Sequence, residues 1–441
     1  MSIADKPVKV ASYLIETYGC QMNVAESNAL ETQLQGIGLT KARCAEEADL
    51  VVLNTCSVRQ TAENRIWGRL GFYSRLKKER PMYLVVTGCM AERLSDQLKK
   101  EAPYVDYVLG TNDKQEILEI AQGMYEDEKA TSYHFQRSYY KEGDLSTYVP
   151  IMNGCNNFCS YCIVPYVRGR EVSRPLSEIL TEVRFLSAKG VKEITLLGQN
   201  VNSYAYEDAT GRKVNFPVLL EAVCTAAEGV EWIRFESPHP KDFSESLIQV
   251  IQKEPRVAKH LHIPLQSGSS RILQLMNRKY DREQFISLIQ RIKEEIPSVT
   301  FSTDVMVGFP GETEEDYMET RSLLELMRCT EAFMYYWNPR EGTRAVKMDG
   351  QLSEETKGER LRKLIDRQQI IFHEEKTARA SGTHRILVTG VSRNDEKQFL
   401  GRGEHNEMVA FTPIGRCVRG EVVAVSYTGV NGNTMTGFQA K

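Results

Sequence analysis

Cys155-Asn156-Asn157-Phe158-Cys159-Ser160-Tyr161-Cys162 is the stretch that decides how this chain is interpreted. Gaps of three and two residues let one loop present three thiolates to three corners of an iron–sulfur cube, so the fourth iron has no protein ligand. An iron with an open position is a site for chemistry. A structural zinc site would close its coordination sphere with paired cysteines or histidines, but no second pair follows here. The nearest downstream histidine, His239, is far away in the sequence.

Three further cysteines, Cys20, Cys56 and Cys89, occupy the same position in three strand-then-helix units. Each follows a β-rich apolar run and precedes a stretch with the apolar spacing of a helix; the runs are residues 12–17, 50–54 and 83–87. Because the carboxyl ends of parallel strands meet at one edge of a sheet, we expect the three thiols to lie together and to bind metal. The alternative is three buried thiols that act only as small apolar side chains.

The whole pattern resembles a known superfamily. A CxxxCxxC motif with an aromatic residue before its last cysteine, here Tyr161, resembles the radical S-adenosylmethionine (SAM) enzymes, in which SAM chelates the open iron and is cleaved to a radical. With three dispersed upstream cysteines and a small β-rich tail, the chain resembles the methylthiotransferases over essentially its full length. The resemblance implies SAM and two 4Fe–4S clusters as cofactors. The implied cluster ligands, also the expected catalytic residues, are Cys155, Cys159 and Cys162 for one cluster and Cys20, Cys56 and Cys89 for an auxiliary one.

Three motifs resemble the methylthiotransferase branch that modifies prenylated adenosine in tRNA. They are Gly19-Cys20-Gln21-Met22-Asn23, the run from Gly198 to Tyr204 and the run from Arg168 to Pro175. The resemblance implies methylthiolation of carbon 2 of N6-isopentenyladenosine at tRNA position 37, with two SAM molecules and a sulfur from the auxiliary cluster. Branches acting on threonylcarbamoyl-adenosine in tRNA or on a ribosomal-protein aspartate are alternatives. A non-catalytic iron–sulfur RNA-binding sensor is a further alternative. Motifs of a SAM pocket weigh against it, because a sensor needs no such pocket.

The SAM pocket is expected where the strands of the core end. Gly198-Gln199-Asn200 stands where radical SAM enzymes usually have Gly-Gly-Glu, and Asp304 to Glu312 resembles their adenine-binding strand. For His239, packing within its loop is an equal alternative to SAM binding. For Gly308, the alternative is a plain turn between a strand and a helix. The expected SAM-binding residues are Tyr161, Gln199, Asn200, Ser237, His239, Gln266, Asp304 and Gly308.

The alternation of strands and helices predicts an α/β protein of three domains. Residues 11–128 are expected to form an open parallel α/β domain with the auxiliary cluster, followed by a charged linker at 125–143. Residues 141–374 are expected to form a partial (βα)6 radical SAM barrel, and a long helix at 353–381 is expected to lead from it into the C-terminal region. Residues 376–440 resemble the TRAM domain, a small antiparallel RNA-binding barrel. Its strands are expected at 386–391, 398–402, 408–411, 417–426 and 435–438.

Composition and charge agree with an enzyme that acts on RNA. The 441 residues carry a net charge of -3, but residues 376–441 have nine Lys or Arg against five Asp or Glu, a net charge of +4. A basic module on an acidic enzyme predicts binding of an anionic polymer, here the tRNA anticodon stem-loop. No apolar run is long enough to span a bilayer and no leader segment is visible, so we expect a cytoplasmic protein with no membrane partner. The resemblance also implies an electron donor such as flavodoxin or ferredoxin, and iron–sulfur cluster assembly or repair proteins.

Overall fold

The computed structural model describes residues 8–57, 60–125, 133, 135, 140–208, 210–393 and 395–440. The chain forms two compact units. The first comprises residues 1–141, 148–158 and 162–174, and the second comprises residues 142–147, 159–161 and 175–441. Most of the linker predicted at 125–143 lies outside the described residues.

The first unit is built on a parallel five-stranded sheet of order β2-β1-β3-β4-β5. Its strands are β1 (Ser12–Thr17), β2 (Thr40–Lys41), β3 (Leu50–Thr55), β4 (Tyr83–Gly88) and β5 (Tyr107–Leu109). Its helices are α1 (Gln21–Gly36), α2 (Gln60–Glu79), α3 (Cys89–Arg93), α4 (Ser95–Glu101) and α5 (Glu116–Gln122). The same unit holds the short helix α6 (Val164–Val167) and the antiparallel pair β7 (Met152–Asn153) and β8 (Val172–Ser173).

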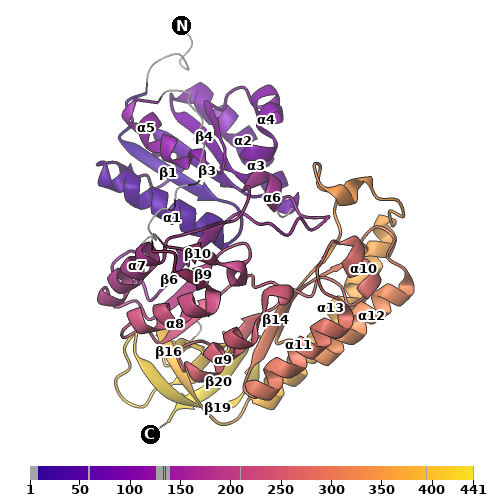
Figure 1. Ribbon diagram of the computed structural model, residues 1–441. Helices are drawn as coiled ribbons and strands as arrows, with labels where there is room; N and C mark the ends of the chain where they lie inside the picture. Colours follow the sequence, from indigo (N-terminus) through magenta and orange to yellow (C-terminus); the bar gives the residue numbers. More distant parts are fainter. Residues whose placement is uncertain are drawn as a thin grey trace. The chain divides into compact units, whose positions relative to one another are not determined.

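Helices cover both faces of this sheet, which is why its central strand, β3, is buried along its whole length. On one face, Val51 and Leu53 of β3 pack with residues of α2, α3 and α4. On the other face, Leu50 and Val52 pack with residues of α1 and α5. Figure 1 shows the two helix layers around the indigo and violet strands. The open parallel α/β architecture expected for this region is confirmed.

The six strands expected for the core follow one another in the predicted order, and all except β6, whose residues are divided between the two units, belong to the second unit. They are β6 (Ser146–Pro150), β9 (Glu193–Leu197), β12 (Trp232–Phe235), β13 (His260–His262), β14 (Thr300–Val307) and β15 (Glu331–Tyr336). β9 and β12 pair in parallel, and β14 pairs in parallel with β13 on one side and β15 on the other. A short antiparallel hairpin, β10 (Ala205–Glu207) with β11 (Lys213–Asn215), interrupts the alternation.

Four of the helices between these strands begin at a side-chain cap. Asp281 and Thr313 each form a capping box, in which the cap side chain and the side chain three residues later exchange hydrogen bonds with the backbone. Ser353 caps the long helix that leads out of the core. The helices are α7 (Leu176–Ala188), α8 (Phe216–Ala226), α9 (Glu245–Lys253), α10 (Ser270–Leu275), α11 (Arg282–Glu295), α12 (Glu314–Met327) and α13 (Glu354–Arg379).

The C-terminal strands form a closed barrel of order β16-β17-β18-β20-β19 around the buried side chains of Ile386, Val409, Phe411 and Val425. Its strands are β16 (Thr383–Val391), β17 (Phe399–Gly403), β18 (Met408–Thr412), β19 (Val422–Asn431) and β20 (Thr434–Gln439). All pairs are antiparallel except β18 with β20. The predicted small barrel, consistent with a TRAM domain, is therefore confirmed.

The fourth strand of the barrel was predicted wrongly, at 417–426. Residues 418–421 form a turn, in which the Glu421 side chain accepts from the backbone of Val418 and Gly420 has a φ of +92°. The strand then passes through an irregularity between Tyr427 and Gly429 and continues to Asn431. Glycine at a bulge was mistaken for the end of the strand.

The barrel is attached to the core by buried polar contacts within the second unit. Arg234 of β12 pairs with the buried Glu193 at 2.9 Å and donates to the backbone oxygens of Gly403 and Glu404. Arg402 of β17 pairs with the same Glu193 at 2.9 Å. No helix within the described residues is both long and apolar enough to cross a membrane.

Candidate active site

The three upstream cysteines lie where neighbouring strands of the first unit end. β1, β3 and β4 pair in register up to their carboxyl ends. Cys20 and Cys56 follow β1 and β3, and Cys89 is the first residue of α3, directly after β4. A Cβ atom on Gly19 would lie 2.7 Å from the Cβ of Cys56, so a glycine is needed for the first two loops to approach this closely. The three strand ends are adjacent, and metal binding by their thiols stays a prediction.

The thiols influence one another's protonation. A hydrogen bond with Cys56 is the largest influence on Cys20, and with the charge of Arg168 it overcomes burial and lowers the pKa of the Cys20 thiol to about 6. Burial raises the pKa of Cys89, and Arg168 again opposes the rise. The thiolate is the form that binds metal. Arg168 therefore favours the metal-binding form of both cysteines.

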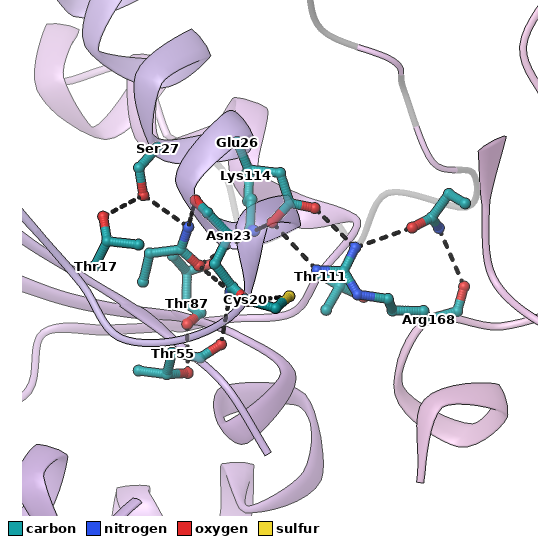
Figure 2. A network of polar contacts seen from close by, with 12 residues as sticks. Thr17, Cys20, Asn23, Glu26, Ser27, Thr55, Thr87, Thr111, Lys114 and Arg168 are labelled. Carbon is teal, nitrogen blue, oxygen red and sulfur yellow. Dashed lines mark hydrogen bonds and ion pairs between the residues drawn. The ribbon is translucent and has the colours of Figure 1, made fainter. Parts of the chain in front are cut away.

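Asn23 fixes the first cysteine. Its side-chain oxygen accepts from the Cys20 thiol at 3.2 Å, and its amide nitrogen donates to Asn54 and to the backbone of Thr55 at 3.1 and 3.0 Å. Asn54 returns two hydrogen bonds, to the backbone of Asn23 and to Ser27. Figure 2 shows Asn23 between the strand ends, with Cys20 beside it. Both asparagines belong to the cysteine motifs, but their bracing role was not predicted.

Glu26 of α1 carries a buried ion network next to these loops. It pairs with Arg168 at 2.8 Å and with Lys114, and Arg168 also donates to Asn153 at 3.0 Å. Burial raises the pKa of the Glu26 carboxyl, but the two cations outweigh burial and hold that pKa at about 2. Figure 2 shows the carboxylate between the two cations. Two cations and one carboxylate leave a net positive charge near the thiols.

The residues present fit an iron–sulfur cluster by their chemistry. Three thiols on adjacent strand ends are the donor set that such clusters use, and a net positive charge nearby suits an anionic group. Among the residues that the structure describes, no three His, Cys, Asp or Glu side chains are already arranged as a metal site. A cluster binds each thiolate through a different iron, so it does not need the close grouping of side chains that a single metal ion needs.

Cys155 and Cys162, the outer cysteines of the CxxxCxxC motif, belong to the first unit. The backbone of Cys155 donates to Gly169 at 3.2 Å, and a Cβ atom on Gly154 would lie 2.1 Å from the backbone oxygen of Arg170. Cys162 stands just before α6, whose Val167, together with Ile163, packs against Cys89.

The middle of the motif belongs to the second unit. Ser160 donates from its backbone to Met276 at 2.9 Å and from its hydroxyl to Leu275 at 2.8 Å, at the end of α10. Tyr161 packs against an apolar cluster that includes Ile272 and Trp337. The aromatic residue of the motif thus has a packing role, and SAM binding by Tyr161 stays a prediction.

Arg278, which sequence reasoning missed, lies directly against this motif. Its Nη1 lies 3.5 Å from the Cys159 sulfur, its Nη2 donates to the backbone oxygen of Pro264, and its Nε donates to the Tyr280 hydroxyl. Tyr280 donates in turn to the backbone oxygen of Leu265 at 2.8 Å. A buried basic residue cannot be recognised from sequence alone when its contact is 119 positions away.

Asn200 braces a neighbouring loop. Its side chain donates to Asp242 at 2.9 Å and accepts from the backbone of His239 at 3.2 Å. The Asn202 side chain donates to the backbone oxygen of His239 and accepts from the backbone N–H of the same residue. Gln199, in contrast, has a buried side-chain oxygen with no hydrogen-bond partner among the described residues. An unsatisfied buried acceptor needs a donor, and the SAM ammonium group would supply one. Gln199 therefore fits the predicted SAM contact better than Asn200.

His239 is held in its neutral form. Burial, with Arg278 and Lys241 nearby, lowers the pKa of His239 to about 2. Its Nδ1 accepts from the backbone of Lys241 at 3.2 Å, so the proton sits on Nε2. Its ring meets Tyr280 edge-on, with centroids 5.6 Å apart.

Two of the predicted residues have a left-handed backbone that side chains rarely adopt. Ser237 has a φ of +59° and Gln266 a φ of +64°, each just beyond the end of a core strand. Gln266 keeps this conformation because its backbone bonds to Asp304 and Met306, both at 2.8 Å. Strain of this kind at strand ends is common in functional sites, so both residues stay candidates.

The last two predicted residues lie on and just after β14. Asp304 contacts His262 at 3.1 Å, and although burial lowers the pKa of His262, this carboxylate outweighs burial and raises it. Gly308 has a φ of +70°, and a Cβ atom there would lie 2.4 Å from Lys357 of α13. Its backbone N–H donates to Glu312 at 2.8 Å. The close approach at Gly308 is therefore to α13, and a SAM contact there stays a prediction.

Comparison with known proteins agrees with this geometry. Residues 149–324 match the family model described as the radical SAM superfamily, and residues 12–110 match the one described as uncharacterized protein family UPF0004. A tRNA-2-methylthio-N(6)-dimethylallyladenosine synthase of Treponema pallidum is 44% identical, covering 94% of this chain and 96% of the relative. Relatives of the same name from Bacteroides fragilis and Syntrophomonas wolfei are 44% and 42% identical, covering 96% and 97% of this chain and 94% and 97% of the relatives.

The chain belongs to the tRNA-2-methylthio-N(6)-dimethylallyladenosine synthase family. This confirms the predicted family, the radical SAM methylthiotransferase class of enzyme, and SAM and 4Fe–4S clusters as its cofactors. The radical SAM methyltransferase TsrM from Kitasatospora setae has a similar fold, with a TM-score of 0.57 and 13% identity over 76% of this chain and 77% of that one.

Proposed function

We propose that this member of the family methylthiolates carbon 2 of N6-isopentenyladenosine at position 37 of tRNA. Relatives with the corresponding name match it over nearly their whole length. The observation that carries the proposal is the joint presence of the loop at 155–162 and three adjacent cysteine-bearing strand ends. The target C–H bond is neither acidic nor electrophilic, so acid–base chemistry cannot replace its hydrogen, whereas a radical can.

Each cysteine set has its own role in the proposed enzyme. Cys155, Cys159 and Cys162 would hold one 4Fe–4S cluster, and Cys20, Cys56 and Cys89 would hold the auxiliary one. When bound, these groups supply the electron that cleaves SAM and the sulfur that enters the product. Arg168 favours the thiolates of the auxiliary site, and Asn23 fixes Cys20. Gln199 offers its buried oxygen to the SAM ammonium group.

The reaction would consume two SAM molecules, one as the methyl source and one as the acceptor of the hydrogen from carbon 2. We expect deuterium placed at carbon 2 of the prenylated adenine to appear in 5′-deoxyadenosine, and the product to gain one methylthio group. Mass spectrometry of both products checks this. Deuterium left on the methylthiolated base, or a product that gains a methyl group without sulfur, would contradict the mechanism.

The alternative functions can be distinguished by their substrates. Synthetic anticodon stem-loops with isopentenyladenosine or threonylcarbamoyl-adenosine, and the ribosomal-protein aspartate peptide, would be offered in parallel. We expect methylthiolation of the isopentenyl substrate alone. A non-catalytic sensor would release no 5′-deoxyadenosine with any of them.

The two cysteine sets are expected to bind their clusters independently. Changing Cys155, Cys159 and Cys162 to Ala should remove about half of the iron and sulfide and abolish SAM cleavage. Changing Cys20, Cys56 and Cys89 to Ala should keep SAM cleavage but prevent sulfur insertion. Iron analysis and quantification of 5′-deoxyadenosine check both. Loss of all iron from either triple variant would exclude two separate sites.

The partners are also part of the proposal. The closed C-terminal barrel would hold the tRNA anticodon stem-loop. A low-potential donor such as flavodoxin or ferredoxin would deliver electrons, and cluster assembly or repair proteins would restore the sulfur, all in the cytoplasm.

A further inference from the structure

Arg278 differs from three other buried arginines of this chain in what neutralises it. Arg168, Arg234 and Arg360 each contact a buried carboxylate, at 2.8, 2.9 and 2.7 Å. Arg278 is only 9% exposed, yet no carboxylate among the described residues pairs with it. Its contacts are a phenol, a backbone oxygen and the sulfur of Cys159.

A buried cation without a counter-charge is costly, and arginine cannot lose its proton in a protein. Two of the groups it contacts can become anionic, the Tyr280 phenol and the Cys159 thiol, which lies 3.5 Å from Nη1. Burial raises the pKa of Tyr280 above its ordinary value, so the phenol stays neutral. A cysteine that ligates iron does so as the thiolate, so the negative charge of a cluster ligand at Cys159 would lie directly beside the Arg278 cation.

The position of the guanidinium is fixed from both sides. Ser160, next to Cys159, is tied to the end of α10 by two hydrogen bonds, two residues before Arg278. On the far side, Tyr280 is anchored to the backbone oxygens of Pro264 and Leu265. The arginine thus cannot turn away from the sulfur without breaking contacts at both ends.

We propose that Arg278 is a positioning residue that makes the cluster on Cys159 easier to reduce. This inference rests on the proposed function, because it requires Cys159 to ligate a 4Fe–4S cluster. Reduction adds one electron from a low-potential donor to the cluster and no bond breaks. The added negative charge would be stabilised by a fixed cation and by an N–H donor at the Cys159 sulfur, two of the factors that set cluster potentials.

The test is a redox titration with dithionite, followed by electron paramagnetic resonance, on the full chain reconstituted with iron and sulfide. Cys20, Cys56 and Cys89 are changed to Ala so that one cluster titrates. At the potential where the parent is half reduced, the ratio of reduced to oxidised cluster should fall on the order of tenfold or more in Arg278→Met, as expected for loss of a unit charge this close. In Arg278→Lys, which keeps the charge, the ratio of reduced to oxidised cluster should fall less.

Lys279→Met is the matched control. It removes the same charge from the neighbouring position, where the side chain is exposed. Solvent and salt screen an exposed charge, so this variant should titrate like the parent. A titration of Arg278→Met identical to the parent's would overturn the inference. If that variant holds no iron, Arg278→Gln decides, since it keeps an N–H for the sulfur but no charge; a parent-like ratio there would equally overturn it. Failure of the parent itself to bind a cluster would instead refute the proposed function.

Discussion

At the scale of single residues, Glu26 is the carboxylate on which two buried cations of the first unit depend. Glu26→Gln keeps the shape but removes the charge that neutralises Arg168 and Lys114. Breaking a buried ion pair from one side costs about 3–5 kcal/mol, so we expect a loss of that order in the free energy of unfolding. Urea unfolding of the full-length chain without clusters measures it.

The surface pair of Glu31 with Lys41 offers the matched control, because Lys41 is half exposed. Glu31→Gln should cost at most about 1 kcal/mol. The double change Glu26→Gln with Arg168→Met should cost less than Glu26→Gln alone, since it removes one of the stranded cations. Equal losses for Glu26→Gln and Glu31→Gln would show that the network contributes no stability.

Gln199 and Asn200 are adjacent in sequence but should respond differently to substitution. Gln199→Ala removes a buried oxygen with no partner among the described residues, so we expect weaker SAM binding and little change in thermal stability. Asn200→Ala leaves Asp242 and the backbone of His239 without that partner, so we expect a lower melting temperature. Calorimetric SAM binding and thermal unfolding of the same two variants separate the roles. A drop in stability with unchanged SAM affinity for Gln199→Ala would remove it from the SAM site.

Sequence reasoning was limited at this scale by distance along the chain. The cysteines were predictable because short spacing and strand-end positions carry the information locally. Arg278 was not, because its contact with Cys159 depends on how α10 folds back on the motif. The opposite roles of Gln199 and Asn200 depend on which side chain meets Asp242, and the sequence does not show this.

At the scale of elements, helices with explicit caps were the most predictable. The spacing of apolar residues predicts helices over 282–295 and 314–327, and α11 and α12 have these bounds. Capping boxes at Asp281 and Thr313 fix where the two helices begin. β19 was misplaced, because Gly429 at a bulge has the same sequence signal as a turn.

The junction between core and barrel should be sensitive to acid. Burial, together with Arg234, lowers the pKa of His260 well below its ordinary value, and burial also lowers the pKa of His405. Below about pH 6.5 the unfolded chain binds protons that the folded junction does not, so stability should fall as the pH drops. The expected slope is up to about 1.4 kcal/mol per pH unit for each histidine. Urea midpoints between pH 8 and pH 5 measure this dependence.

Substitution separates the junction from general acid effects. His260→Gln should flatten the slope, whereas His373→Gln, at an exposed position of α13, should leave it as it is. The same slope in both variants would show that the acid sensitivity arises elsewhere.

At the scale of the whole molecule, the barrel cannot be treated as a separable tail. Leu387 of β16 packs with Trp232 and Ala258 of the core, and Arg234 donates to two backbone oxygens of the barrel. Removing the barrel would expose Trp232 and leave part of the Arg234 guanidinium without acceptors. A test of RNA binding by truncation would therefore confuse lost contacts with lost stability.

Charge changes on an intact barrel avoid that problem. Arg393, Lys397 and Arg416 are exposed on the barrel. Changing all three to Gln should weaken binding of the anticodon stem-loop and make the dependence of affinity on salt shallower, because fewer phosphate counter-ions are released. Fluorescence anisotropy at several salt concentrations measures both. Lys99→Gln with Lys100→Gln, on exposed positions of α4, is the control for a general change in charge. An unchanged salt slope in the barrel variant, with SAM cleavage intact, would mean that another surface of the chain binds the tRNA.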